Sequence, residues 1–282
     1  MKTRILSGVG VVVFLIAMLL CTYTPFFSLF LALLSGVAVF EIERVAQVKN
    51  KAIMGISVAF SALLPVLISA GVNLPVPLVA IGYTILLLIL MLAQYEITRF
   101  EHVAIALFVS LGIPLAFSCM IFLRDIYTVY PQAYSKADGL LFVLFGISSA
   151  WVTDMFAYFI GSKFGKHKMT PKLSPKKSVE GAVGGVIGAA LLTVIYGMVF
   201  RGAMGSEMSH VWIMAAISAA GALVSMVGDL TASAIKRNYG IKDYGKLIPG
   251  HGGILDRFDS VIFTAPLIYF LAANLILSLI HI

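Results

Sequence analysis

Charge is scarce in this sequence, since Asp, Glu, Lys and Arg make up only 12% of its 282 residues. Cysteine is scarce as well. Cys21 and Cys119 are the two present, each inside an apolar run, which excludes a disulfide framework and a cysteine-based metal site. Zinc motifs of the HExxH or paired CxxC type are also absent from the sequence. Apolar residues reach 60% and the mean hydropathy is +1.02, which predicts an integral membrane protein.

The sequence also lacks a signal-peptide cleavage site and a nucleic-acid-binding module. No small-x-small cleavage site follows the first apolar run, so that run is expected to be a retained helix. No module of interleaved basic and aromatic residues indicates nucleic-acid binding. The net charge of +7 is therefore interpreted as membrane topology and attraction to anionic lipid.

The apolar runs predict how many times the chain crosses the membrane. Nine runs are long enough for a hydrocarbon core of about 30 Å, namely residues 5–21, 25–40, 52–70, 76–93, 103–123, 140–161, 181–199, 211–230 and 260–279. If the N-terminus is cytoplasmic, every Lys and Arg except Arg124, Lys136 and Arg201 falls in a cytoplasmic segment, as the positive-inside rule favours. The predicted fold class is all-α, a polytopic membrane protein of about nine transmembrane helices with a cytoplasmic N-terminus.

Polar residues divide the chain into two predicted regions. Residues 1–135 resemble ordinary transmembrane helices, spans one to five, and residues 136–282 form a predicted catalytic transmembrane region. That region holds spans six to nine and two cytoplasmic loops, 162–180 and 237–259. The acids of the first region are expected to lie at the membrane interface: Glu41, Glu43, Glu96 and Glu101.

Span six carries the first polar residues of interest. Asp154 falls about two turns before the inner end of the span, and Tyr158 lies one turn further on. An acid at this depth needs a partner, a metal ion or a water-filled cavity. Span seven begins with GAVGGVIG, in which Gly184 and Gly188 form a GxxxG pair that predicts close helix packing.

The lysine-rich loop between spans six and seven suits phosphate. Lysine side chains such as those of Lys176 and Lys177 supply point charges, while Ser174 and Ser178 add neutral donors. The alternative is that these lysines only orient the helices and attract anionic lipid.

The stretch from Ser225 to Ser260 concentrates charge in an otherwise apolar half. Asp229, Ser233 and Lys236 are spaced i, i+4, i+7, so a helix continuing from span eight would carry them on one face. Asp256 and Asp259, spaced i, i+3, are predicted to share a face on the first turns of span nine. The carboxylates of Asp229, Asp256 and Asp259 would suit Mg²⁺, which prefers carboxylates together with substrate phosphates.

Glycine and histidine lie between these helices. The sequence Pro249-Gly250-His251-Gly252-Gly253 predicts tight turns that let the backbone approach a ligand closely. In this charged loop His251 is expected to make a polar or phosphate contact and not to act as a general base. A phosphate nucleophile is already anionic near neutral pH.

These residues resemble a known motif. The chain matches S-x-x-K-R-x4-K-D-x-G-x2-I-P-G-H-G-G-I-x-D-R-x-D of the bacterial phosphatidate cytidylyltransferases (CDP-diacylglycerol synthases) from Ser233 to Asp259. Their D-x-x-A-Y-x-x-G pattern recurs from Asp154 to Gly161, and S-P-x-K-T-x-E-G recurs from Ser174 to Gly181 with Ser178 in place of Thr. Many members carry an acid where this chain has Ala232.

The resemblance implies a reaction, its cofactors and its residues. CTP and phosphatidic acid would give CDP-diacylglycerol and pyrophosphate, with Mg²⁺ and a possible K⁺, in a homodimer of the inner membrane whose active site faces the cytoplasm. Catalytic roles fall to Asp229, Ser233, Lys236, Asp256 and Asp259, of which the three acids bind metal. Substrate contacts fall to Asp154, Tyr158, Ser174, Lys176, Lys177, Ser178, Arg237, Lys242, Asp243, His251 and Arg257.

Two other functions fit parts of the pattern. A CTP-dependent polyprenol or phytol kinase would use the same nucleotide on an alcohol. A lipid or anion transporter would use the acids for a coupling ion, although the two halves show no matched pair of interrupted helices.

Overall fold

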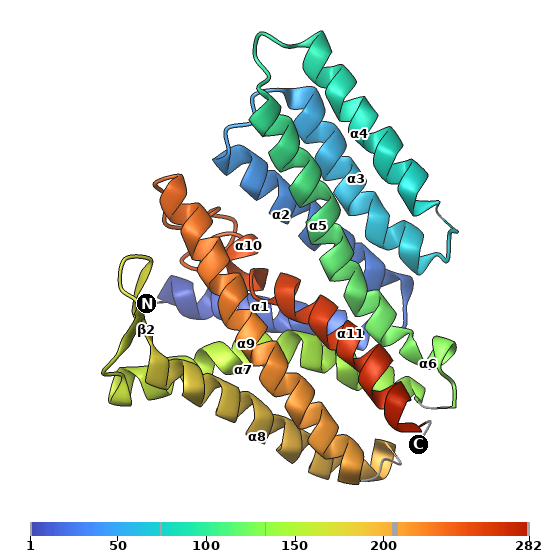
Figure 1. The fold of residues 1–282 in the computed structure, drawn as a ribbon, viewed down its shortest axis with the longest axis vertical. Coiled ribbons are helices and arrows are strands. Elements are labelled where there is room, and N and C mark those ends of the chain that lie inside the picture. The colour runs from blue at the N-terminus through green and yellow to red at the C-terminus, as the bar shows by residue number, and fades with distance from the viewer. Residues whose placement is uncertain (1, 74, 133, 205–207, 281–282) are drawn as a thin grey trace. The chain divides into compact units, whose positions relative to one another are not determined.

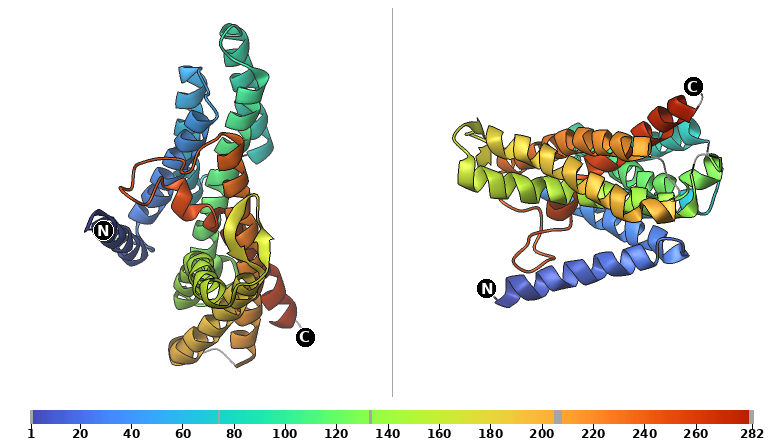
Figure 2. Two further views of the ribbon diagram at one scale, coloured as in Figure 1. Left: turned by 90° about the vertical axis from the view of Figure 1, so that its left-hand side faces the viewer. Right: turned by 90° about the horizontal axis from the view of Figure 1, so that it is seen from below.

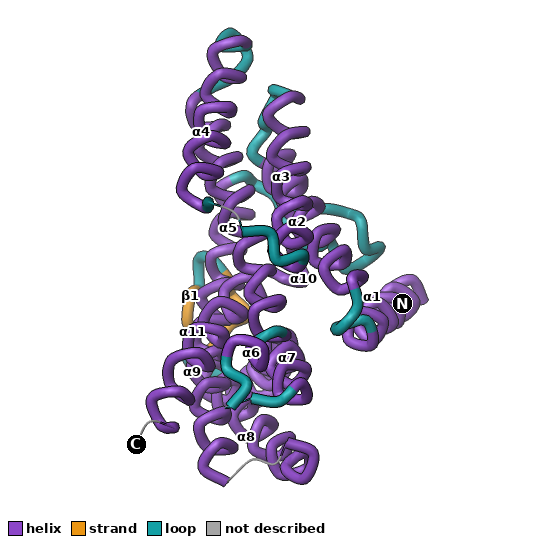
Figure 3. The backbone as a smooth tube through the Cα atoms, turned by 90° about the vertical axis from the view of Figure 1, so that its right-hand side faces the viewer, coloured by secondary structure: helices purple, strands orange, loops and turns teal. Residues whose placement is uncertain are grey.

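The computed structural model describes residues 2–73, 75–132, 134–204 and 208–280, and nearly all of their regular structure is helical (Figure 1). The long helices are α1 (Lys2–Leu20), α2 (Pro25–Val45), α3 (Lys51–Ser69), α4 (Val76–Ala93), α5 (Phe100–Arg124), α7 (Lys136–Phe164), α8 (Val179–Met204), α9 (Met208–Asn238) and α11 (Val261–Ile280). Two helices are short, α6 (Ile126–Val129) and α10 (Leu255–Phe258). Strands β1 (Lys168–Thr170) and β2 (Ser174–Ser178) pair antiparallel and are drawn in orange in Figure 3. The all-α prediction is confirmed except for this small hairpin.

A long helix covers each predicted span. Among the described residues, seven helices are long and apolar enough to cross a membrane: α2, α3, α4, α5, α7, residues 179–199 of α8 and residues 211–238 of α9. The chain is therefore a multi-pass membrane protein. The total of nine crossings and the cytoplasmic N-terminus stay predictions.

The chain folds as two compact units. The first unit runs to Ile121 and also includes the segment Tyr239–Arg257, and the second unit comprises Phe122–Asn238 and Phe258–Ile282. The predicted functional division at residue 135 stays a prediction.

In the first unit, an apolar core joins the end of α2 with α3, α4 and α5. Ile53, Leu87 and Ala106 are fully buried in it, and the rings of Phe60 and Tyr83 stack with centroids 4.1 Å apart. Asn50 starts α3, because its Oδ1 accepts hydrogen bonds from two backbone N–H groups of the first turn. The cap fixes where α3 begins, and the buried side chains hold α3, α4 and α5 together.

Two acids of α2 turn into the protein. Glu41 is 3% exposed and Glu43 is fully buried. The Ser57 hydroxyl of α3 donates to Glu43 Oε1 at 2.5 Å. Glu96 and Glu101 are exposed. That these four acids lie at the membrane interface stays a prediction. Apolar periodicity cannot show which acids at a helix end turn inward.

In the second unit, glycines bring α7 and α8 into close contact. A side chain added at Gly184 would meet Ile160, one at Gly185 would meet the carbonyl oxygen of Thr153, and one at Gly188 would meet Phe156. The packing role predicted for this glycine run is confirmed. The hairpin stands where α7 ends and α8 begins, as two views of the ribbon show (Figures 1 and 2).

Helix α11 closes the second unit against α7 and α9. The Tyr134 hydroxyl donates to the carbonyl oxygen of Ala272 at 2.7 Å, just before α7 begins. Ser135 and Asp138 then form a capping box that starts α7. These contacts fix the helix that carries Asp154 and Tyr158.

Candidate active site

A cavity of about 260 Å³ opens in the second unit among α7, the hairpin, α8 and α9. Many of the predicted site residues line it: Asp154, Tyr158, Ser174, Lys176, Lys177, Ser178 and Asp229. The rest of the wall is small or apolar, formed by Ala157, Met169, Gly181, Ala182 and Met226. The structure therefore brings together residues that the sequence placed in three separate motifs.

Two of the residues that line this cavity form an ion pair. Lys177 of β2 pairs with Asp229 of α9, and each side chain keeps about a quarter of its surface exposed, 24% and 25% respectively. Lys176 precedes it and is more exposed. A lysine next to a carboxylate suits a phosphate that is bound beside a metal ion, because the lysine can contact the phosphate and the carboxylate can bind the metal.

The lysine-rich loop is folded as a hairpin whose two ends are held. The backbone N–H of Gly181 donates to Ser178 Oγ at 3.2 Å, and Ser178 is buried. Glu180 accepts hydrogen bonds from the backbone N–H groups of Lys166 and His167 and contacts His167 Nδ1 at 2.6 Å. The hairpin is thus fixed over the ends of α7 and α8, which positions Ser174 and Lys177.

Asp259 lies in the turn between α10 and α11 and is buried among other charges of the second unit. The pKa of Asp259 is raised to about 7, by burial above all, then by the charge of Asp229 and to a smaller extent by that of Asp154. Lys236 and the backbone N–H of Ser260, which donates to Asp259 Oδ1 at 2.8 Å, act in the opposite direction. The carboxylates of Asp229 in α9 and Asp154 in α7 therefore both disfavour a negative charge on Asp259.

Carboxylates that repel one another are suited to a divalent cation. Among the described residues no three His, Cys, Asp or Glu side chains are grouped closely enough to hold one ion by themselves. Mg²⁺ is commonly held by one or two carboxylates together with substrate phosphates and water. Asp229 and Asp259 fit a site of that kind.

The glycine-rich loop of the first unit is folded around Asp256. The backbone N–H groups of Tyr244 and Gly253 both donate to Asp256 Oδ2, at 2.8 and 2.9 Å. Arg257 Nε donates to the carbonyl oxygen of His251 at 3.0 Å. Gly252, with φ of 91°, adopts a conformation that a side chain would strain. Asp256 thus organises the loop that carries His251 and Arg257.

The predicted helical faces are partly confirmed. Helix α9 continues to Asn238, so Asp229, half-buried Ser233 and half-buried Lys236 do follow one another along it. Asp256 and Asp259 do not lie on the first turns of span nine, because α11 begins only at Val261. Asp256 belongs to α10 in the first unit, whereas Asp259 lies in the second.

The remaining predicted substrate residues are solvent-accessible. Arg237 lies in the last turn of α9 and is exposed, as are Lys242 and Asp243. Two residues that the sequence did not single out also contact the loop. Glu41 accepts hydrogen bonds from it and Arg44 donates one to it, both from α2. The only hint in the sequence was that an acid and a base lie one turn apart near the end of an apolar run.

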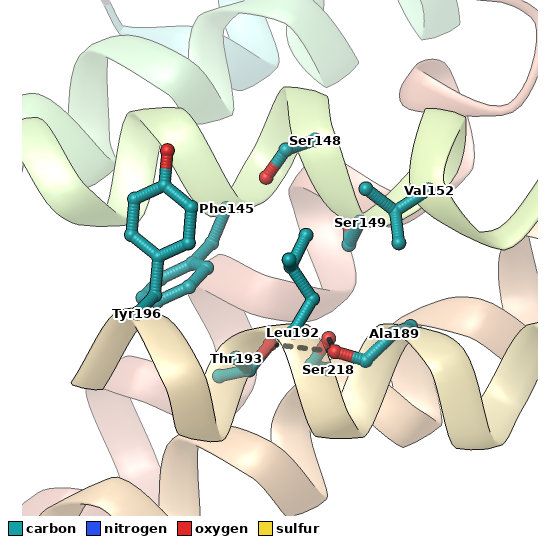
Figure 4. Close-up of a pocket in the computed structure, with 9 residues that line it drawn as sticks. All are labelled: Phe145, Ser148, Ser149, Val152, Ala189, Leu192, Thr193, Tyr196 and Ser218. Carbon is teal, nitrogen blue, oxygen red and sulfur yellow. Dashed lines mark hydrogen bonds between the residues drawn. The ribbon is translucent and has the colours of Figure 1, made fainter. Parts of the chain in front are cut away.

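A second cavity, of about 10 Å³, lies deeper among α7, α8 and α9 (Figure 4). Hydroxyl groups line it, and those of Thr193 and Ser218 both donate to the carbonyl oxygen of Ala189, at 2.9 and 3.2 Å. This volume is about the smallest that can hold a single water molecule. No predicted site residue lines it, so we assign it to helix packing.

Comparison with known proteins gives the same family as the motifs do, and the match extends over nearly the whole chain. The profile of the cytidylyltransferase family matches residues 2–275. The phosphatidate cytidylyltransferase of Bacillus subtilis is 32% identical over 278 residues, which cover 97% of this chain and 98% of that protein. The phosphatidate cytidylyltransferase of Thermotoga maritima is 33% identical over 148 residues, 52% of this chain and 53% of that protein. A third such protein, from Staphylococcus epidermidis, is 33% identical over 134 residues, 48% of this chain and 50% of that protein.

Proposed function

This chain belongs to the cytidylyltransferase family, and from that premise we propose that it transfers the cytidylyl group of CTP to phosphatidic acid. The products are CDP-diacylglycerol, a precursor for phospholipid synthesis, and pyrophosphate. The observation that carries the proposal is the match to a phosphatidate cytidylyltransferase over 97% of the chain, joined with a cavity where two of the matched motifs meet beside Asp229.

The reaction needs positioning and charge neutralisation more than acid–base chemistry. A phosphate oxygen of phosphatidic acid forms a bond to the α-phosphorus of CTP, the bond from that phosphorus to the bridging oxygen breaks, and pyrophosphate leaves. The nucleophile is already anionic, so no side chain has to remove a proton. An in-line displacement of this kind is accelerated mainly by holding the two phosphates together and stabilising their charge.

The cations of the chain hold the phosphates. In the cavity Lys176 and Lys177 contact phosphate together with the hydroxyls of Ser174 and Ser178, while Asp154 and Tyr158 complete the wall. A volume of about 260 Å³ is below the range of roughly 300–1,000 Å³ typical of sites for whole small molecules, so it suits the phosphates and not the entire nucleotide. Further phosphate contacts come from Lys236, Arg237, Lys242, His251 and Arg257, with Asp243 beside them.

Asp229 and Asp259 would hold Mg²⁺, with Asp256 as a third candidate ligand and Ser233 nearby. Bound there, the ion would neutralise phosphate charge and orient the attacking and leaving oxygens, and K⁺ is a candidate second ion. With Asp229 as a metal ligand, Lys177, its partner in the ion pair, would be available to the substrate phosphate.

The proposed orientation follows from charge: the lysine-rich hairpin and the glycine-rich loop face the cytoplasm, where CTP is made. The family resemblance implies in addition that the chain resides in the bacterial inner membrane as a homodimer. The distribution of Lys and Arg supports this orientation. Light scattering of the detergent-solubilised chain would measure the number of copies.

The deciding experiment uses the purified chain with CTP, phosphatidic acid in mixed micelles, and Mg²⁺. We expect pyrophosphate release that requires both substrates and stops when EDTA removes the metal. Label on the α-phosphate of CTP should enter the lipid and label on the γ-phosphate should not. Transfer of the γ-label to an alcohol would instead identify a lipid kinase. Consumption of neither substrate would favour a transporter.

A further inference from the structure

Helix α2 contacts both arms of the glycine-rich loop of the first unit. Glu41 Oε1 accepts a hydrogen bond from the backbone N–H of Ile254 at 3.1 Å, and Oε2 accepts one from Leu255 at 2.9 Å. One turn further along α2, Arg44 Nη2 donates to the carbonyl oxygen of Tyr244 at 2.9 Å. Residues about 200 positions apart in sequence are thereby joined at three backbone groups.

The loop is shaped around the Glu41 carboxylate. A side chain added at Gly253 would meet both carboxylate oxygens of Glu41, and one added at Gly245 would meet Oε1. Gly253 does not have a positive φ, so its need for glycine comes from this contact and not from backbone strain. Glu41 therefore occupies the space that two glycines of the loop leave open.

Two carboxylates together satisfy four backbone N–H groups of this loop. Asp256 accepts from Tyr244 and Gly253, and Glu41 accepts from Ile254 and Leu255. Burying a carboxylate is costly unless hydrogen bonds compensate, and an apolar residue would fill the space at less cost. A buried acid here is thus better explained by what it holds than by packing.

We propose that Glu41 is a positioning residue for cytidylyl transfer. Its carboxylate fixes residues 253–255, and through them it fixes His251, Asp256 and Arg257 in the geometry that the reaction needs. Arg44 secures the opposite arm at Tyr244. The role rests on the function proposed above for this loop, and it assigns part of the site to the N-terminal helices.

The first test compares the isosteric variant Glu41→Gln with the shorter acid Glu41→Asp. Glutamine keeps the shape but offers one acceptor, and its NH₂ group faces an N–H donor, so we expect kcat to fall about 10- to 100-fold. Aspartate keeps both acceptors and should lose less activity. Glu101→Gln, at an exposed acid of α5, is the matched control and should leave kcat unchanged. A role in packing alone would reverse the order, with Gln tolerated better than Asp, and would overturn the proposal.

The second test is a double-mutant cycle between Glu41 and Gly253. Gly253→Ala should displace the carboxylate and lower kcat as Glu41→Gln does. Glu41→Ala removes the obstructing atoms, so adding Gly253→Ala to it should cause little further loss. Independent effects that multiply would show that Gly253 serves some other purpose, and would contradict the inferred contact.

A third readout does not depend on the reaction. Lys242 and Lys246 are exposed trypsin sites in the opposite arm of the loop, which Asp256 joins to the arm that Glu41 holds. Releasing residues 253–255 should loosen both arms and make cleavage at these lysines about tenfold faster in Glu41→Gln than in the wild type or Glu101→Gln. An inactive wild type would refute the proposed function, while proteolysis would still report on the anchor. An active wild type with unchanged kcat and unchanged proteolysis in Glu41→Gln would refute the anchor alone.

Discussion

Asp229 makes the most consequential single contact of the cavity. It pairs with Lys177, and its charge is the main electrostatic cause of the raised pKa of Asp259. Asp229→Asn keeps the size of the side chain and removes this charge. Because a carboxylate is needed to hold a divalent cation, we predict a loss of CTP-dependent pyrophosphate release of at least about 10²–10³-fold, measured in isolated membranes.

The loss must be separated from failure to insert. Asp229→Asn should accumulate in the membrane fraction at the wild-type level, because an amide is less costly there than an acid. Glu96→Gln, at an exposed acid in the connection before α5, should keep full activity. Normal turnover by Asp229→Asn would remove Asp229 from the mechanism.

Single residues show how much of the candidate site could be predicted from the sequence. Asp154, Ser174, Lys177 and Asp229 could be grouped beforehand, since polar side chains are costly in an apolar chain and therefore indicate function. Glu41 could not be grouped with them. Its spacing resembles that of any acid at a membrane interface, and only the fold shows that four backbone donors have two carboxylates as partners.

At the scale of elements, the contact between α7 and α8 determines the width of the cavity. The carbonyl oxygen of Thr153 lies 2.9 Å from where a Cβ at Gly185 would be, and backbone cannot move aside as a flexible side chain can. Gly185→Ala should therefore push the helices apart and destabilise the protein by about 1–3 kcal/mol. It should also lower turnover, because α7 carries Asp154 and Tyr158.

Thermal unfolding in detergent measures the first effect and pyrophosphate release the second. Gly112→Ala in α5 is the matched control, since a Cβ there meets nothing within 4 Å. It should be neutral or stabilising by up to about 1 kcal/mol, as expected for glycine replaced by alanine within a helix. Equal stability of the two variants would show that α7 and α8 are not in close contact at Gly185.

Hydropathy predicted the long apolar helices, but not the ends of the helices or the hairpin. Each apolar run became a helix, because a chain in lipid must satisfy its backbone internally. Hydropathy cannot locate the end of a helix that continues into water. The apolar run ends at residue 230, and only the spacing of Asp229, Ser233 and Lys236 predicted that α9 continues beyond it, to Asn238. The hairpin was missed too, since its lysines give no alternating pattern and its strands are held by Ser178 and Glu180.

At the scale of the whole molecule, the first unit joins segments that the sequence separates. The segment Tyr239–Arg257 belongs with the N-terminal helices, held by Glu41 and Arg44 of α2. Motif comparison had pointed only to the C-terminal half as catalytic. Contacts between distant segments leave no local pattern, so this part of the site could be found only from the fold.

The cavity can use cytoplasmic CTP only if the hairpin that lines it faces the cytoplasm. Gln132 and Lys172 are both exposed in the second unit, and α7, a candidate span, lies between them in sequence. One crossing puts them on opposite sides, and the positive-inside rule puts Lys172 in the cytoplasm. In a Cys21→Ser, Cys119→Ser background, a membrane-impermeant maleimide should label Gln132→Cys on intact cells and Lys172→Cys only after permeabilisation. If intact cells label Lys172→Cys instead, the hairpin and its cavity face away from the nucleotide, and cytidylyl transfer at this site is refuted.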